Sequence, residues 1–245
     1  MVDVAFFQWA NGRHVATLRW VCQSCRVTFE ATLFDMDGLL IDSEILWHKA
    51  EMEIFGRLGV PIDEQTDRST KGMYVNSVVD YWFDRFPWSG PSPDEIVDQL
   101  LRRVGDLVES EGVLMPGALR AIDLAAQCGP VALASSTPLA LIHRCLAHFS
   151  LDDRFVSVHS AEFEPYGKPH PGVFLTAASS LRVDPTRCLV FEDSVAGVVA
   201  GKAASMFVVA VPTHDDRSQR AFAIADLVLG SLEELDGIWL AAQFA

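Results

Sequence analysis

Two aspartates, Asp35 and Asp37, follow residues 27–34, a run of β-branched and aromatic side chains that predicts a buried strand. In an extended backbone, residues two positions apart point to the same face, so both carboxylates should lie together. Gly38 comes next and allows a sharp turn. Paired carboxylates at a strand end can bind a divalent cation or divide the roles of nucleophile and general acid/base. Because Asp and Gly are also common in solvated turns, this motif alone leaves both interpretations open.

Three further segments carry polar residues where a strand should end or a helix should begin. Ser135 and Ser136 offer a hydroxyl and backbone N–H groups that suit a phosphate. Lys168 precedes a predicted helix and can neutralise an oxyanion. Glu192 and Asp193 follow a predicted strand and suit a hard cation with oxygen ligands. Helix capping or an exposed lysine would explain each segment alone, but all four motifs in one chain indicate a single site.

The elements around these residues predict an α/β fold. Apolar runs of strand length lie at 131–134, 155–158, 188–191, 206–211 and 227–229. Helix-length segments alternate with them, at 119–128, 139–149, 170–181 and 194–204. Alternating strands and helices are typical of a parallel sheet covered on both faces. Such sheets bind their ligands at the carboxyl ends of the strands, which is where the polar motifs are expected.

A helical insertion interrupts this alternation. Between 45 and 114 the sequence predicts helices only, with candidates at 45–58 and 75–86 and an apolar face of helical spacing over 96–108. We therefore expect three units, namely an N-terminal extension (1–26), an α/β core (27–44 with 115–245) and an inserted all-helical domain (45–114).

The amino-acid composition excludes several classes of partner. Nineteen Lys and Arg against 33 Asp and Glu give a net charge of −14, which argues against nucleic acid and anionic membrane surfaces as partners. No apolar run is long enough for a membrane span. Five scattered cysteines do not predict a disulfide scaffold, and a cytoplasmic setting fits them best. Cys22 and Cys25 form a Cys-x-x-Cys pair, but the chain has no second pair to complete a zinc site.

The order of the polar motifs resembles the signature of the haloacid dehalogenase (HAD) superfamily. The matching residues are Asp35-x-Asp37-Gly, Ser135, Lys168 and Glu192-Asp193, and the insertion resembles the helical cap of that superfamily. The likeness is closer still to its sugar-phosphatase branch, over 34–44, 81–91, 133–138, 165–171 and 192–197. The resemblance implies a Rossmann-like HAD core with an inserted all-helical cap, and it covers nearly everything after residue 27.

The resemblance also implies a Mg²⁺-dependent phosphatase that hydrolyses small phosphomonoesters, with sugar or hexitol phosphates favoured. Asp35 would be the nucleophile that forms an aspartyl-phosphate, and Asp37 the general acid/base. Ser135, the N–H of Ser136 and Lys168 would stabilise the transferred phosphoryl group.

The metal site implied by the resemblance uses oxygen ligands only. Asp35, the main-chain oxygen of Asp37 and Asp193 would hold Mg²⁺, with Glu192 supporting them. The substrate itself and the oligomeric state stay open.

Two alternatives remain. A β-phosphoglucomutase-like enzyme would share the chemistry of Asp35 and Asp37 but return the phosphoryl group to a sugar. The related mutases use a cap histidine, whose position an ungapped reading gives to Trp47, with His48 one residue further on. An indole cannot act as a base, so water is the expected acceptor. A catalytically idle phosphometabolite-binding protein is the second alternative, but binding alone would not require an acid/base at position 37.

Overall fold

A computed structural model of the chain describes residues 28–62, 73–213 and 216–244. Within these ranges, six strands form one parallel sheet in the order β3-β2-β1-β4-β5-β6. The strands are β1 (Ala31–Phe34), β2 (Val131–Ser135), β3 (Ser157–Ser160), β4 (Cys188–Glu192), β5 (Phe207–Ala210) and β6 (Leu227–Val228). The predicted α/β class with a parallel sheet is confirmed.

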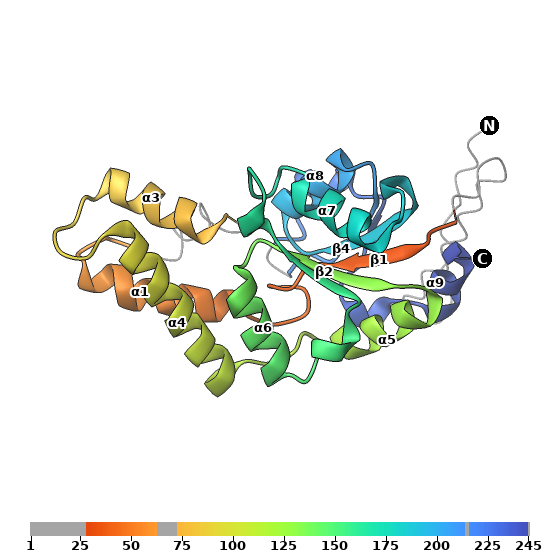
Figure 1. The fold of residues 1–245 in the computed structure, drawn as a ribbon, viewed down its shortest axis with the longest axis horizontal. Helices are drawn as coiled ribbons and strands as arrows, with labels where there is room; N and C mark the ends of the chain where they lie inside the picture. The colour runs from red at the N-terminus through yellow and green to blue at the C-terminus, as the bar shows by residue number, and fades with distance from the viewer. Residues whose placement is uncertain (1–27, 63–72, 214–215, 245) are drawn as a thin grey trace.

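Helices cover both faces of the sheet (Figure 1). One face carries α7 (Gly172–Leu181) and α8 (Val195–Ala203); the other carries α5 (Ala118–Cys128), α6 (Leu139–His148) and α9 (Gly237–Phe244). Successive side chains of a strand point to opposite faces. In β1, accordingly, Leu33 is fully buried in the core under α7 and α8, whereas Phe34 is fully buried in the other core. Burial on both faces explains why these strands read as continuous apolar runs.

Between β1 and α5 the described residues, 35–62 and 73–117, include three helices of an insertion. They are α1 (Glu44–Arg57), α3 (Val75–Arg85) and α4 (Pro93–Glu111), and they lie beyond the carboxyl ends of the strands (Figure 1). Their shared core includes the buried side chains of Phe55, Trp82 and Leu100. The hydroxyl of Ser92 accepts from the N–H of Glu95, whose carboxylate in turn accepts from the N–H of Ser92. This reciprocal capping fixes the start of α4.

The chain leaves and re-enters the sheet through two neighbouring segments. The N–H of Asp42 donates to the carbonyl of Val113 at 3.0 Å, and the N–H of Met115 donates to the carbonyl of Leu40 at 2.8 Å. The insertion is therefore joined to the sheet by two chain segments that are hydrogen-bonded to each other. The limits predicted for it, 45–114, stay a prediction, and the predicted extension 1–26, with Cys22 and Cys25, lies outside the described residues.

Short 3-10 helices connect the main elements. They are η1 (Asp152–Arg154), η2 (Ala161–Phe163), η3 (Pro185–Arg187), η4 (Arg220–Ile224) and η5 (Leu232–Glu234). Among the described residues, no helix combines the length and the apolar character that crossing a membrane would require.

The strand predicted at 155–158 is wrong by two residues, because β3 spans Ser157–Ser160. This strand is an edge of the sheet and has β2 as its one neighbour. Three of its four residues are only partly buried. Val156, which made the sequence look like a strand, is 70% exposed. An edge strand needs less apolar surface than a central one, so an apolar run marks it poorly.

Candidate active site

The carboxyl ends of the central strands bring three of the polar motifs to one place. In the sheet register, Phe34 of β1 lies opposite Leu133 of β2 on one side and Phe191 of β4 on the other. Asp35 follows Phe34, and Glu192 ends β4. Residues far apart in the sequence therefore meet at the carboxyl ends of the strands, which face the helical insertion (Figure 1).

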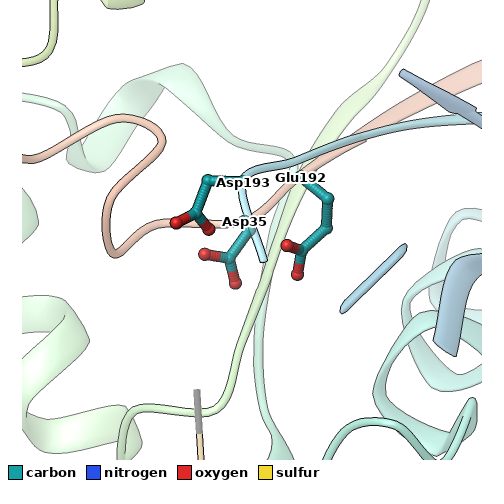
Figure 2. A group of neighbouring side chains, drawn as sticks. All are labelled: Asp35, Glu192 and Asp193. Carbon is teal, nitrogen blue, oxygen red and sulfur yellow. The ribbon is translucent and has the colours of Figure 1, made fainter. Parts of the chain in front are cut away.

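Three buried carboxylates form the centre of the site. Asp35, Glu192 and Asp193 offer oxygen atoms that all lie within 4.8 Å of one another. Figure 2 shows them gathered where β1 and β4 end. Their exposed fractions are 6%, 0% and 2%, respectively. Ionised carboxylates this close together and this poorly hydrated need a compensating positive charge.

Lys168 supplies part of that charge. Its ammonium group donates to Asp35 Oδ1 at 2.5 Å, to Glu192 Oε1 at 2.7 Å and to the carbonyl of Ala134 at 3.1 Å. Its side chain is only 3% exposed. One ammonium among three ionised carboxylates leaves a net negative charge. A divalent cation would balance that charge, and the oxygen atoms are the ligands that Mg²⁺ prefers.

The pKa values report the same competition between burial and charge. Burial raises the pKa of Asp35 to about 8; the charge of Lys168 opposes this shift, whereas Glu192 and Asp37 add to it. Burial alone would lower the pKa of Lys168, but the carboxylates of Asp35 and Glu192 overcome that effect and raise it above its ordinary value. Lys168 is therefore a permanent cation, and the ionised form of Asp35 depends on positive charge nearby.

Glu192 is fixed on both of its oxygens. Oε1 accepts from Lys168, and Oε2 accepts from the N–H of Ser194 at 2.8 Å and from its hydroxyl at 3.0 Å. Gly197, in the first turn of α8, packs so closely that a Cβ there would overlap the Glu192 carboxylate. Glu192 thus holds the ammonium group of Lys168 beside Asp35. Its role in the site is to support Lys168.

Gly38 allows the turn after Asp37 to approach the acidic cluster. Its φ is +73°, a conformation that L side chains rarely adopt. A Cβ at Gly38 would also overlap the carboxylate of Asp193. A side chain at this position would therefore push the turn away from the site.

Asp37 is held by four side-chain donors within the described residues. Oδ1 accepts from Ser43 Oγ at 2.6 Å and from Trp47 Nε1 at 3.2 Å. Oδ2 accepts from Thr137 Oγ1 at 2.7 Å and from Ser135 Oγ at 3.3 Å. The donors to Oδ1 come from the start of α1, and the donors to Oδ2 come from the end of β2 and the loop after it.

The loop that follows β2 is itself ordered by hydrogen bonds. Ser135 Oγ accepts from the N–H of Thr137 at 3.0 Å, and Ser160 Oγ donates to the carbonyl of Thr137 at 2.7 Å. Ser136 lies between Ser135 and Thr137 and is partly exposed. The loop so formed can present a hydroxyl and backbone N–H groups to a phosphate.

The structure brings together Asp35, Lys168, Glu192 and Asp193, and it joins Asp37 to Ser135. Ser43 and Thr137 were not predicted as donors to Asp37, although both lie in stretches that carry the resemblance. Trp47 was expected at the position of a mutase histidine or as apolar surface facing a sugar, and its role as a donor to Asp37 was not foreseen. The unbroken run of three hydroxyl residues at 135–137 was the available signal for Thr137.

Comparisons with known proteins agree with this geometry. A family model described as haloacid dehalogenase-like hydrolase matches residues 29–205. Hexitol phosphatase B of Escherichia coli (strain K12) is 44% identical over 207 residues, which cover 84% of this chain and 93% of that protein. The structure of CbbY from Rhodobacter sphaeroides in complex with phosphate has a TM-score of 0.75 at 29% identity, covering 84% of this chain and 96% of that one.

A further solved structure shows likeness of fold alone. β-Phosphoglucomutase from Clostridium difficile has a TM-score of 0.76 at 24% identity, covering 88% of this chain and 97% of that one.

Proposed function

The chain belongs to the haloacid dehalogenase-like hydrolases and is a phosphatase, and from this premise we propose that it is a Mg²⁺-dependent enzyme that hydrolyses sugar or hexitol phosphates. The observation that carries the proposal is the buried group of Asp35, Glu192 and Asp193 around Lys168. The printed name of the 44% identical relative, hexitol phosphatase B, supports the substrate class.

In the first step, a carboxylate oxygen of Asp35 attacks phosphorus. The bond between phosphorus and the ester oxygen breaks, and the leaving alkoxide takes a proton from Asp37. The product is an alcohol, with the phosphoryl group on Asp35. In the second step, Asp37 takes a proton from water as that water attacks the same phosphorus. The Asp35 carboxylate and inorganic phosphate are released, so both residues return to their starting states.

The transferred phosphoryl group needs positive partners in a poorly hydrated site. Lys168 is fixed by Glu192 and Asp35, so little reorganisation is needed when charge develops. Ser135 ends β2 and donates to Oδ2 of Asp37, whereas Trp47 donates to Oδ1, and Ser136 follows Ser135 in the loop after the strand. These groups would hold the phosphoryl oxygens during both steps.

The chain's residues fit a divalent cation. The carboxylates of Asp35 and Asp193 and the main-chain oxygen of Asp37 would hold it, with Glu192 supporting the arrangement. When bound, Mg²⁺ neutralises the repulsion between the phosphate and Asp35 and orients the ester for in-line attack. Three buried carboxylates that share one ammonium group carry more negative than positive charge when ionised, which favours such an ion.

The proposal is tested by phosphate release from a panel of hexitol and hexose phosphates. We expect turnover with Mg²⁺, its loss after exhaustive EDTA treatment, and its return when Mg²⁺ is added back. Undiminished turnover in EDTA would rule out the metal-dependent mechanism.

A second assay separates hydrolysis from the mutase alternative. The protein is incubated with β-glucose 1-phosphate, Mg²⁺ and a trace of the bisphosphate. We expect inorganic phosphate to accumulate faster than glucose 6-phosphate, because Trp47 near Asp37 offers an N–H donor and no basic nitrogen. Faster accumulation of glucose 6-phosphate would identify a mutase.

A further inference from the structure

Glu162 is an acidic side chain close to the proposed phosphate site that the mechanism does not use. Its Oε2 accepts from the N–H of Leu139, the first residue of α6, at 3.0 Å. Leu139 comes two positions after Thr137, so their Cα atoms are at most about 7 Å apart. Thr137 in turn donates to Oδ2 of Asp37. The Glu162 carboxylate therefore lies beside the loop that would hold the phosphate.

Hydrogen bonds hold the short helix η2, which carries Glu162, against that loop. The N–H of Glu162 donates to Ser160 Oγ at 3.1 Å, and Ser160 Oγ donates to the carbonyl of Thr137 at 2.7 Å. Glu162 itself is partly exposed, and none of the ion pairs between described residues includes it. Its negative charge is thus fixed in place, and within the described part of the chain no ion pair neutralises it.

Tyr74 of the insertion lies near the same carboxylate. It precedes α3, and a Cβ placed on Gly167 would lie 3.6 Å from the Tyr74 Cβ. The start of α3 therefore packs against the loop before α7 (Figure 1). Burial raises the pKa of the Tyr74 hydroxyl above its ordinary value, and the negative charge of Glu162 adds to that shift. The field of Glu162 thus extends into the region between the sheet domain and the insertion.

In-line transfer sets the direction in which the alcohol part of the substrate extends. In the proposed reaction, the attacking oxygen of Asp35 and the leaving oxygen lie on opposite sides of phosphorus. Asp35 follows β1, so the alcohol part points away from the strand ends and toward the insertion. A phosphoryl group held by Lys168 and the loop after β2 would place this path next to Glu162, whose carboxylate contacts the start of α6.

We propose that Glu162 is a selectivity residue that makes the enzyme prefer phosphate esters with an uncharged alcohol part and reject those that carry a second anionic group, such as a carboxylate or another phosphate. This inference rests on the proposed function. The hydroxyls of a polyol can donate to the Glu162 carboxylate, whereas a second anion is repelled by it. Glu162 touches none of the reacting atoms and acts on the alcohol part only.

Two esters that differ in one end group test this selectivity. D-Glucitol 6-phosphate and 6-phosphogluconate share their carbon chain and its inner hydroxyls, but the end opposite the phosphate is a CH₂OH group in the first and a carboxylate in the second. We would measure kcat/KM for both esters with the wild type and with Glu162→Gln. Glutamine keeps a side-chain oxygen that can accept from the N–H of Leu139, so the start of α6 stays capped.

Glu164→Gln is the matched control. Glu164 belongs to the same loop and is also partly exposed, but its carboxylate accepts from Thr176 Oγ1 of α7 at 2.6 Å. Glu162→Asp provides a second comparison, because it keeps the negative charge on a shorter side chain. Both variants should therefore keep the preference for the uncharged ester.

We expect the wild type to have a kcat/KM for D-glucitol 6-phosphate at least about 10-fold above that for 6-phosphogluconate, the order expected for like charges about 12 Å apart near a protein surface. Glu162→Gln should raise kcat/KM for 6-phosphogluconate by about 10-fold. The value for D-glucitol 6-phosphate should change less than about 3-fold, because the glutamine oxygen still accepts from hydroxyls.

Ionic strength provides a measurement that needs no variant. Salt screens the repulsion between Glu162 and a second anion, so the preference of the wild type should narrow as the ionic strength rises from about 0.05 M to about 0.5 M. The ratio of the two kcat/KM values in Glu162→Gln should depend less on salt.

Other outcomes would overturn the inference. A wild type without the preference would contradict it and leave the proposed function intact, and an unchanged preference in Glu162→Gln would assign the selectivity to another group. Equal losses with both esters in Glu162→Gln would leave Glu162 with the capping of α6 alone. If Glu162→Gln does not fold, loss of the preference in Glu162→Asp, or a wild-type ratio that does not respond to salt, contradicts the inference. A wild type that hydrolyses neither ester would instead overturn the proposed function, and with it this inference.

Discussion

At the scale of single residues, Asp35 combines deep burial with a direct contact to a cation. Asp35→Asn keeps the shape of the side chain but removes the nucleophilic carboxylate, so we expect no measurable turnover. Phosphate release is the measurement, and circular dichroism checks folding. Asp80→Asn is the matched control, since Asp80 is exposed on α3. Wild-type rates for Asp35→Asn would mean that another residue is the nucleophile.

Asp37 should respond differently to substitution by asparagine, because four side-chain donors hold it in place. In Asp37→Asn, the amide oxygen should remain with Trp47 while its NH₂ group faces hydroxyls that can rotate to accept. The fold should therefore survive, but proton transfer is lost. We expect turnover of sugar phosphates to fall by roughly 10²–10⁴-fold.

The reaction with p-nitrophenyl phosphate checks this assignment of Asp37. Its first step needs no acid, whereas hydrolysis of the intermediate still needs a base. Asp37→Asn should therefore show a burst of p-nitrophenol followed by slow turnover. A slow first step with this ester would contradict the acid/base role.

At the scale of elements, the central strands were the most predictable part of the fold. The strands β1, β2 and β4 are buried on both faces, so each is a nearly continuous apolar run that ends at a polar motif. The α/β class with a parallel sheet and the placement of the polar motifs at strand ends followed from that pattern, whereas the HAD core with its cap was implied by the resemblance of the motifs. The edge strand β3 was misplaced, because a strand that pairs on one side only and is partly buried does not need a continuous apolar run.

The hydrogen bonds of the site were not predictable in the same way. Lys168 and Asp35 are 133 positions apart, and their contact depends on how β1, β2 and the loop before α7 are arranged in space. Likewise, Trp47 at helical spacing in an apolar segment is ordinarily a core residue. Its bond to Asp37 depends on the angle at which α1 leaves the sheet, which no local pattern specifies.

A clamp between two helices joins the insertion to the sheet domain. Arg144 of α6 donates to the carboxylates of Glu109 and Asp106 of α4, and to the carbonyl of Arg102. Gly105 leaves the space that the Arg144 guanidinium occupies, because a Cβ there would overlap it. Gly105 therefore lowers the helix propensity of α4 but leaves room for the Arg144 guanidinium.

We therefore expect the effects of Gly105→Ala and Arg144→Ala on the free energy of unfolding to be non-additive. Alanine exceeds glycine in helix propensity by about 1 kcal/mol, so Gly105→Ala in an Arg144→Ala background should raise the free energy of unfolding by that amount. In the wild-type background the gain should be smaller, because the new Cβ displaces the guanidinium. Urea unfolding of the four proteins measures the coupling. Equal effects of Gly105→Ala in both backgrounds would show that the clamp does not constrain α4.

At the scale of the whole molecule, the site is assembled from both parts of the chain. The sheet contributes Asp35, Lys168 and Glu192, and the insertion contributes the Trp47 donor to Asp37. A chain with a net charge of −14 can nevertheless take an anionic substrate, because Lys168 and the proposed cation would set the local potential. Net charge therefore restricted the partners in the sequence analysis but could not locate the substrate.

The residues just before β1 are tied to the rest of the sheet domain. The N–H of Phe29 donates to the carbonyl of Gln243 at 2.8 Å, and the N–H of Glu30 donates to that of Arg187 at 2.8 Å. The ring of Phe29 lies 5.3 Å from that of Phe207 and 6.2 Å from that of Phe244. These contacts tie the start of β1 to α9 and to the far side of the sheet, so stability should depend on residues from 28 onward.

We therefore expect a shortened chain that begins at Arg26 to keep full turnover and stability, because every contact of Phe29 remains. A chain that begins at Ala31 should lose about 3 kcal/mol or more of stability, the usual loss when a buried phenylalanine is removed. Phosphate release and urea unfolding of both chains provide the measurements. If the chain from Arg26 folds normally but loses turnover, residues 1–25, including Cys22 and Cys25, would contribute to catalysis, and the proposed site would be incomplete.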